Sequence, residues 1–421
     1  MMKKLAGFVL SFLLVQLIHA QRNCSSHEYV RRMLETDPTL AQRISEIEQF
    51  THRLTHRTVE VNDLPGSAAD QPVLVIPVVV HVVYHYPEEN IPDSRIRDQI
   101  EILNRDFRRL NADTSNIPDG FADLSADIRI EFRLATSDPK GRATSGVVRK
   151  YSPLTKWKMD DKVKFDDELG SDAWDASQYL NIWVCNMDDL LGYASFPGTP
   201  LERDGIVINY KAFGPVGYFS QYNKGRTTVH EVGHWLNLRH IWGDSDCGDD
   251  LVGDTPPQRS YTPGCPSGVR VTCNNASNGG DMYMNYMDFT SDACVNMFTY
   301  GQKQRMRTLF EEGGPRHSFL NSRGLDDPIL EEGSLPDNTP KWLHIKLYPN
   351  PANSTVTMNF QYDVRWIGKE LRVTDLSGRI VMRTTISHAI HTVDISRLAP
   401  GVYFIDGEKE GEKMREKFIK L

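Results

Sequence analysis

The residues with the clearest chemical potential lie between positions 230 and 240, where the chain reads His-Glu-Val-Gly-His-Trp-Leu-Asn-Leu-Arg-His. His230 and His234 are four residues apart, so on a helix both imidazoles point from one face. Glu231 follows the first histidine and can reach the open side of a metal ion without binding it. This spacing is typical of a catalytic zinc site.

His240 extends the pattern to a third imidazole. It lies six residues beyond His234, and at about 3.6 residues per turn this position falls on the wrong face of a continuous helix. His240 can therefore join the site only if the helix ends and the chain folds back. Asn237 lies where that turn must come, and asparagine tolerates a positive φ. We predict zinc ligation by all three histidines.

Several helices and strands must position these side chains. Residues 227–236 form the predicted zinc helix. Apolar, amphipathic and alternating runs predict a central strand at 73–84, a helix at 96–107, and strands at 128–134 and 180–184. Residues 191–197 are typical of an edge strand that binds a peptide by strand addition. The pattern indicates an α+β catalytic domain. His81 and His85, on or just after the first strand, are interpreted as structural.

Both ends of the chain carry segments outside this domain. Residues 1–20 combine Lys3 and Lys4 with an apolar stretch and a small residue at Ala20, which predicts a secretory signal peptide. Residues 21–60 are polar and helix-prone, as in a propeptide, and are followed by the catalytic domain at 61–325. After a linker at 326–340, short alternating runs with turn residues predict a small β-sandwich at 341–421.

Chain length and net charge bear on the number of domains and on the kinds of partner that the protein can bind. The chain has 421 residues, enough for two or three domains, and a net charge of −8. This acidic balance gives no indication of binding to nucleic acid or anionic membranes. Beyond the signal peptide, no stretch reaches the roughly 18 apolar residues of a spanning helix. We predict an exported protein without a transmembrane segment.

Six cysteines fit an exported protein. Four of them follow the histidine motif, namely Cys247, Cys265, Cys273 and Cys294. They predict two disulfides, with three possible connectivities, because the paired spacing of a structural zinc site is absent. Cys185 lies in an apolar strand and is interpreted as a buried thiol. Cys24 is an unpaired thiol near the start of the predicted propeptide.

A second motif lies between Met284 and Met306, where Met-Asn-Tyr-Met-Asp precedes Cys294. Together with the histidine motif, it resembles the Met-turn of metzincin metallopeptidases and, more closely, the pappalysin family with its ulilysin-like bacterial members. The resemblance covers roughly residues 70 to 320. It implies that Met287 forms the hydrophobic floor beneath the histidines. It also implies disulfides Cys247–Cys273 and Cys265–Cys294.

The same resemblance implies two further ligand sets. An acidic loop after the histidine motif suits calcium, which prefers six to eight oxygen ligands, and Asp250, Asp254 and Thr255 match the family pattern best. A solvated acidic loop is the alternative. In some ulilysin-like precursors a cysteine near the start of the propeptide caps the zinc, so Cys24 is expected to close the site. An unpaired terminal thiol without a role is the alternative.

The pattern departs from the family at Phe289. Pappalysins usually carry tyrosine there, whose hydroxyl helps to stabilise the oxyanion, and phenylalanine has no donor. Loss of one oxyanion donor can cost roughly 3–4 kcal/mol. Either another hydroxyl replaces it, with Tyr283 and Tyr286 nearby in sequence, or the zinc polarises the carbonyl largely alone.

The C-terminal segment carries its own resemblance. A Tyr-Pro-Asn-Pro opening from Tyr348, an Asp-x-x-Gly turn at Asp375, Gly-Val-Tyr-Phe from Gly401 and a lysine-rich end resemble the sorting domain of type IX secretion. This implies a Gram-negative bacterium, the type IX machinery as partner, and passage across the outer membrane to the exterior or the cell surface. A carbohydrate-binding or adhesive sandwich is the alternative.

We therefore predict a secreted zinc endopeptidase, made as a latent precursor, that hydrolyses peptide bonds in protein or peptide substrates. Glu231 would act as general base and then as general acid on water activated by the metal. Two rivals remain, a zinc-binding protein without turnover and an adhesin whose working part is the sandwich. Some ulilysin-like enzymes prefer Arg or Lys after the scissile bond, and Asp292 lies near the Met-turn where an acidic pocket would be needed.

Overall fold

The computed structural model describes residues 24–62, 71–329, 341–342, 345, 347–360, 366–388, 390–409 and 412–421. The predicted signal peptide and most of the predicted linker lie outside these ranges. Among the described residues, none of the helices has the length and apolar character needed to span a membrane.

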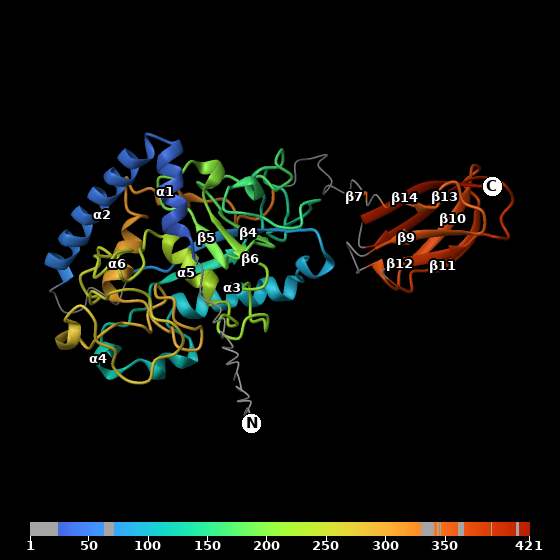
Figure 1. The fold of residues 1–421 in the computed structure, drawn as a ribbon. Helices are drawn as coiled ribbons and strands as arrows, with labels where there is room; N and C mark the ends of the chain where they lie inside the picture. The colour runs from blue at the N-terminus through green and yellow to red at the C-terminus, as the bar shows by residue number, and fades with distance from the viewer. Residues whose placement is uncertain are drawn as a thin grey trace, which may run out of the picture.

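A mixed sheet of six strands forms the centre of the catalytic part (Figure 1). The strands follow the order β2-β1-β4-β6-β5, and β3 also pairs with β1. All of them run parallel to their neighbours except β5, which is antiparallel to β6 at the edge. The bounds are β1 (Leu74–Tyr84), β2 (Ile130–Leu134), β3 (Val147–Tyr151), β4 (Leu180–Cys185), β5 (Gly192–Ala194) and β6 (Ile206–Asn209). The four predicted strands are confirmed, whereas β3 and β6 were not predicted.

The helices cover this sheet and its edge. Their bounds are α1 (Ser26–Thr36), α2 (Leu40–Asn62), α3 (Asp93–Phe107), α4 (Asp119–Ala122), α5 (Arg226–Trp235) and α6 (Tyr300–Thr308). Short 3-10 turns are η1 (Pro87–Glu89), η2 (Ala112–Asn116), η3 (Lys162–Lys164), η4 (Leu201–Arg203), η5 (Asn275–Asn278) and η6 (His317–Asn321). Helix α3 matches its prediction, because its apolar residues repeat at helical spacing and are buried.

Two apolar cores lie on the two faces of the sheet. On one face, α3 and α5 pack against alternate residues of β1 and β4, such as Val80 and Ile182. On the other face, Tyr29 and Met33 of α1 join a cluster that includes Trp183 of β4. The alternation along each strand therefore places α5, with the histidines, on the face opposite to the apolar side chains of α1.

The C-terminal unit is all-β, as predicted. One sheet has the order β11-β10-β13-β14-β7 and the other β12-β9-β8, and one buried apolar cluster is drawn from both sheets. The bounds are β7 (Lys341–Trp342), β8 (Leu347–Tyr348), β9 (Thr355–Asn359), β10 (Glu370–Asp375), β11 (Ile380–Thr385), β12 (Ile390–Asp394), β13 (Gly401–Lys409) and β14 (Glu412–Lys420).

Candidate metal centre and active site

The structure brings the three motif histidines together. The Nε2 atom of His234 lies 3.1 Å from Nε2 of His230 and 3.2 Å from Nε2 of His240. Helix α5 ends after Trp235, and Asn237 adopts a φ of 70°. The amide of Leu238 then donates to the carbonyl of Gly233 at 2.9 Å, a hydrogen bond typical of a left-handed helix end. The predicted turn at Asn237 is therefore confirmed, and it carries His240 back to the helix.

The opposite ring nitrogens show that the cluster suits a metal ion. The Nδ1 atoms of His230 and His234 lie 2.7 Å and 2.8 Å from the carbonyls of Tyr286 and Leu238, and carbonyls only accept. Each Nδ1 therefore carries the proton, which leaves the Nε2 lone pair directed at the other rings. Nδ1 of His240 contacts the Asp244 carboxylate in the same manner.

The chemistry of this donor set fits zinc. Burial, and secondarily His240, lower the pKa of His234 to about 3, which keeps that imidazole neutral. Converging lone pairs repel one another unless a cation lies between them. Nitrogens held about 2.0 Å from a tetrahedral zinc lie about 3.3 Å apart, close to the observed separations.

Cys24 completes the cluster. It lies in the predicted propeptide, residues 21–60, which is called the N-terminal segment below. Its Sγ atom lies 3.4 Å from Nε2 of His234 and 3.5 Å from Oε2 of Glu231. The sulfur and the three histidines form a group of potential metal ligands within 4.8 Å of one another. Burial and the charge of Glu231 raise the pKa of the Cys24 thiol. A bound zinc would reverse that preference, because thiols that coordinate metal lose their proton.

Ser26 provides a second contact that the sequence did not indicate. Its hydroxyl donates to Oε2 of Glu231 at 2.8 Å and accepts from the Ala194 amide at 2.9 Å. Cys24 also forms a parallel bridge with Gly192 of β5. The start of the N-terminal segment therefore lies along the predicted substrate strand and covers Glu231.

Met287 lies beneath the histidines. It is fully buried, and a Cβ atom added to Gly233 would lie 2.5 Å from its Sδ atom. Gly233 precedes His234 on α5, so the missing side chain lets the methionine approach the helix closely. The position is consistent with the predicted hydrophobic floor.

Phe289 forms an aromatic wall beside the site. Its ring centroid lies 5.6 Å from that of His230, 4.8 Å from His240 and 4.9 Å from Trp242. Tyr286 turns its backbone carbonyl toward His230, while its ring packs on Phe298 and lies 5.5 Å below the Arg226 guanidinium carbon. Tyr286 is therefore unsuited to replace the missing hydroxyl.

Comparison with known proteins identifies the family. Residues 163–311 match the peptidase family described as Pregnancy-associated plasma protein-A. An extracellular metalloprotease of Sordaria macrospora is 40% identical over 259 residues, which are 59% of this chain and 78% of that protein. An extracellular metalloprotease of Arthroderma benhamiae is 32% identical and covers 55% of this chain and 70% of its own length. The chain belongs to the pappalysin family of zinc metalloendopeptidases.

Solved pappalysin structures agree with this assignment. Mature mirolysin of Tannerella forsythia with a cleaved peptide is 50% identical, with a TM-score of 0.58, and covers 59% of this chain and 96% of its own. A promirolysin variant of that organism is 46% identical, with a TM-score of 0.62, and covers 70% of this chain and 95% of its own. The metzincin fold and synthesis as a precursor are therefore confirmed. Residues 346–421 match the secretion system C-terminal sorting domain, which confirms type IX secretion and argues against an adhesin.

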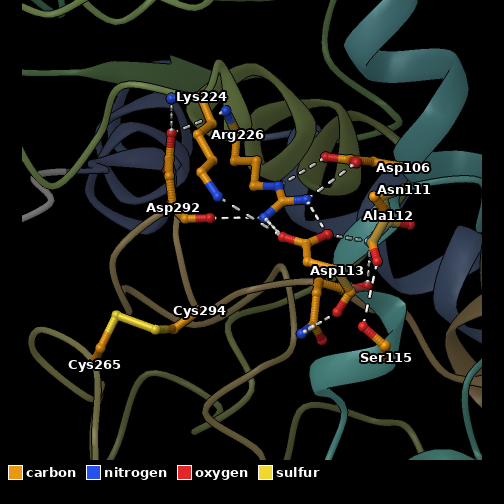
Figure 2. Close-up of polar contacts among 11 residues, drawn as sticks. Asp106, Asn111, Ala112, Asp113, Ser115, Lys224, Arg226, Cys265, Asp292 and Cys294 are labelled. Atoms are coloured by element: carbon orange, nitrogen blue, oxygen red, sulfur yellow. Dashed lines mark hydrogen bonds and ion pairs between the residues drawn. A yellow bond between two sulfur atoms is a disulfide. The ribbon is translucent and has the colours of Figure 1, made fainter.

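In this pappalysin, buried charges hold the start of α5, the helix that carries His230 and His234 (Figure 2). Arg226, the first residue of α5, is 5% exposed and pairs with Asp106 at 3.1 Å and Asp113 at 2.6 Å. Asp292 is fully buried, and its Oδ2 atom accepts from the amides of Lys224 and Arg226 at 2.8 Å and 3.2 Å. Asp292, which lies near the Met-turn in sequence, thus supports the helix N-terminus.

Both disulfides have the pairing that the family resemblance implied. Cys247 is bonded to Cys273, and Cys265 is bonded to Cys294. They close segments of 26 and 29 residues in a region with little regular structure, and each cross-link stabilises the fold mainly by restricting the unfolded chain. Cys185 is a buried free thiol, as predicted.

Residues of the acidic loop, and His81 on β1, form hydrogen bonds with other residues of the protein. The Thr255 hydroxyl donates to Asp250 at 2.8 Å, while Asp254 accepts from Thr299 and Gly301 at the start of α6 at 2.6 Å and 2.8 Å. His81 bonds Ser171 and Asn181, and burial lowers its pKa to about 4. His81 therefore has the structural role predicted for it.

Proposed function

We propose that His230, His234 and His240 hold the catalytic zinc and that Glu231 is the general base and then the general acid of peptide hydrolysis. The observation that carries this proposal is the convergence of three Nε2 lone pairs beside the Glu231 carboxylate. When bound, zinc supplies Lewis-acid chemistry, which makes water acidic near neutral pH and stabilises negative charge on the scissile carbonyl oxygen.

Side chains and backbone groups of the protein transfer the proton, bind the substrate and exclude water. Glu231 takes a proton from the attacking water at a carboxylate oxygen and delivers it to the nitrogen of the departing amine. The amide of Ala194 on β5, which Ser26 engages in the precursor, donates to the backbone of a substrate laid along the strand. Gly192 keeps this strand close to Glu231, because a Cβ atom there would lie 3.1 Å from Cγ of Glu231. Phe289 and Trp242 exclude water on the side of His240.

Latency is proposed to reside in residues 21–60, with Cys24 as the fourth zinc ligand. The contacts of Sγ with the histidine cluster support this role. Ser26 also contributes to latency, because its hydroxyl donates a hydrogen bond to the Glu231 carboxylate at 2.8 Å. Removal of this segment would free both the metal and the general base. Residues 1–20 would act as the signal peptide before the sorting domain directs export, after which the protease is released or stays at the cell surface.

Cys24→Ala tests the latency proposal. The uncleaved Cys24→Ala precursor should hydrolyse a short fluorogenic peptide at least about tenfold faster than the wild-type precursor, which requires loss of only about 1.4 kcal/mol of the closing contact. Initial rates are measured while gels show the precursor to be intact. Cys185→Ala, which alters the other free cysteine, should not change the rate. If the Cys24→Ala precursor is no more active than the wild-type precursor, Cys24 does not keep the precursor inactive.

We further propose that the acidic loop binds calcium through Asp250, Asp254 and Thr255. Asp250 is a buried carboxylate whose pKa burial raises to about 7, a cost that a bound cation would offset. Asp254 joins the loop to α6, so a cation there would tie the loop to a helix. Calcium would thereby order a segment that has little secondary structure of its own.

Removal of the two metals should have different effects on the mature enzyme. A zinc-selective chelator should abolish casein hydrolysis, and added zinc should restore it. EGTA with zinc supplied should lower Tm by about 5–10 °C, since a ligand at a hundred times its Kd contributes about 2.7 kcal/mol, and calcium should reverse the change. Casein hydrolysis that resists zinc removal would contradict the proposed chemistry. An unchanged Tm in EGTA would contradict the proposed calcium site.

A further inference from the structure

The N-terminal segment inserts one side chain into a polar pocket on the sheet face opposite to α5. Tyr29 of α1 is 2% exposed. Its hydroxyl donates to Oδ2 of Asp161 at 2.8 Å, and the hydroxyl of Tyr193 donates to Oδ1 at 3.2 Å. The ring centroids of the two tyrosines lie 5.0 Å apart. One carboxylate therefore holds two phenols side by side.

A buried cation completes this pocket. Lys164 has a fully buried side chain, and its Nζ atom lies 2.9 Å from Oδ1 of Asp161. The ammonium also lies 5.0 Å from the ring centroid of Tyr29, 5.4 Å from that of Trp183 and 5.1 Å from that of Tyr193. These distances allow cation–π attraction with each ring. We call the set Asp161, Lys164, Trp183 and Tyr193 the Tyr29 pocket.

All four residues of the Tyr29 pocket belong to the catalytic part, and only its occupant belongs to the segment that we propose is removed. When α1 leaves, Oδ2 of Asp161 loses the phenol, and Arg203 remains at 3.5 Å. Lys164 keeps its hydrogen bond of 2.7 Å to the Arg203 carbonyl. The mature enzyme thus retains the carboxylate, the ammonium and the Tyr193 ring that contact the phenol of Tyr29 in the precursor, with Trp183 beside the ammonium. Buried charges of this kind are costly without partners.

The Tyr29 pocket adjoins the strand proposed to bind substrate. Tyr193 is the middle residue of β5, between Gly192 and Ala194. These two neighbours are the residues contacted by Cys24 and Ser26. One strand therefore separates the catalytic cleft from the pocket, so a peptide bound at the cleft can reach it with a residue a few positions away.

We propose that, in the mature enzyme, the Tyr29 pocket binds a tyrosine side chain of the protein substrate and so contributes to substrate selection. The inference rests on the proposed peptidase function. A tyrosine restores the hydrogen bond to Asp161 and offers its ring to Lys164, whereas phenylalanine supplies only the ring. An acidic side chain meets the Asp161 carboxylate, and a basic one meets the Lys164 ammonium.

A peptide scan with the mature enzyme tests the proposal. Peptides that share one scissile bond carry a single tyrosine moved through each position on either side of it, with alanine elsewhere. At one position, tyrosine should raise kcat/KM about tenfold over alanine, mainly by lowering KM, and phenylalanine should give a smaller gain. In Lys164→Met and Asp161→Asn the ratio of tyrosine to alanine peptides should fall to about the value that phenylalanine gives with the wild-type enzyme. This ratio is internal to each variant, so a lower overall activity does not affect it.

Lys162→Met is the matched control, because Lys162 lies on the same 3-10 turn but its side chain is 51% exposed; it should keep the wild-type ratio. Equal cleavage of all peptides by wild type would overturn the pocket and leave the peptidase function intact. A preference that persists unchanged in Lys164→Met and Asp161→Asn would also overturn it. If the mature enzyme cleaves neither these peptides nor casein, the proposed chemistry is overturned, and with it this role of the pocket.

Discussion

Glu231→Ala should lower casein hydrolysis by the mature enzyme about 10²–10⁴-fold, the usual contribution of a general acid–base, while the protein keeps its zinc. Zinc should stay bound because its three nitrogen donors, the converging Nε2 atoms, belong to histidines and not to Glu231. The Glu231 carboxylate lies beside the cluster, where it contacts Ser26 and Cys24 in the precursor. The substitution therefore removes proton transfer without removing a nitrogen donor.

Two measurements on the same sample decide this prediction. Casein turnover reports the chemistry, and metal analysis reports the zinc per chain. Glu202→Ala, at an exposed glutamate on η4, is the matched control and should keep both values. Turnover close to wild type in Glu231→Ala would refute the assigned role. Loss of zinc together with activity would instead show that Glu231 is needed for binding the metal.

Arg226→Met should lower the free energy of unfolding of the mature chain by about 3–5 kcal/mol, because it removes one partner of a buried ion pair. Arg226 is 5% exposed and pairs with Asp106 and Asp113. Burial raises the pKa of Asp106. At Asp113, burial acts in the same direction, but the guanidinium holds the pKa below its usual value. Without Arg226 both carboxylates lose this compensation at the start of the zinc helix.

Chemical denaturation of the mature chain measures the effect. Arg105→Met is the matched control, because Arg105 is 51% exposed and its pair with Glu101 lies on the surface; such pairs contribute about 0–1 kcal/mol. Arg226→Met should also bind zinc less tightly, since α5 carries His230 and His234. A stability within about 1 kcal/mol of wild type would show that solvent or neighbouring groups compensate the two aspartates.

The sequence was most informative where the chemistry depends on local geometry. The spacing of His230 and His234, and the turn residue Asn237, required a helix that ends and folds back, and the structure contains that turn. The long apolar run of β1 and the periodicity of α3 identified those elements for the same reason. The cysteine pairing came from the family resemblance, because four cysteines alone leave three connectivities open.

The remaining features depend on contacts between distant residues. Ser26 meets Glu231 across 205 positions of the chain, and no local pattern marks that contact. Arg226 meets Asp106 across 120 positions, and a lone arginine at the start of a helix is not distinctive. Strand β6 has only four residues, so its apolar run resembles many buried segments. Asp244 lies four residues after His240 in an acidic loop, and nothing in that local pattern shows that its carboxylate orients the His240 ring.

Zinc-edge X-ray absorption, recorded on the precursor and on the mature enzyme, tests the central claim most directly. The precursor should show three nitrogen neighbours at about 2.0 Å and one sulfur at about 2.3 Å, from the three histidines and Cys24. The mature enzyme should keep the nitrogens and lose the sulfur. A precursor without a sulfur neighbour, or a zinc site with fewer than three histidine nitrogens, would contradict the account.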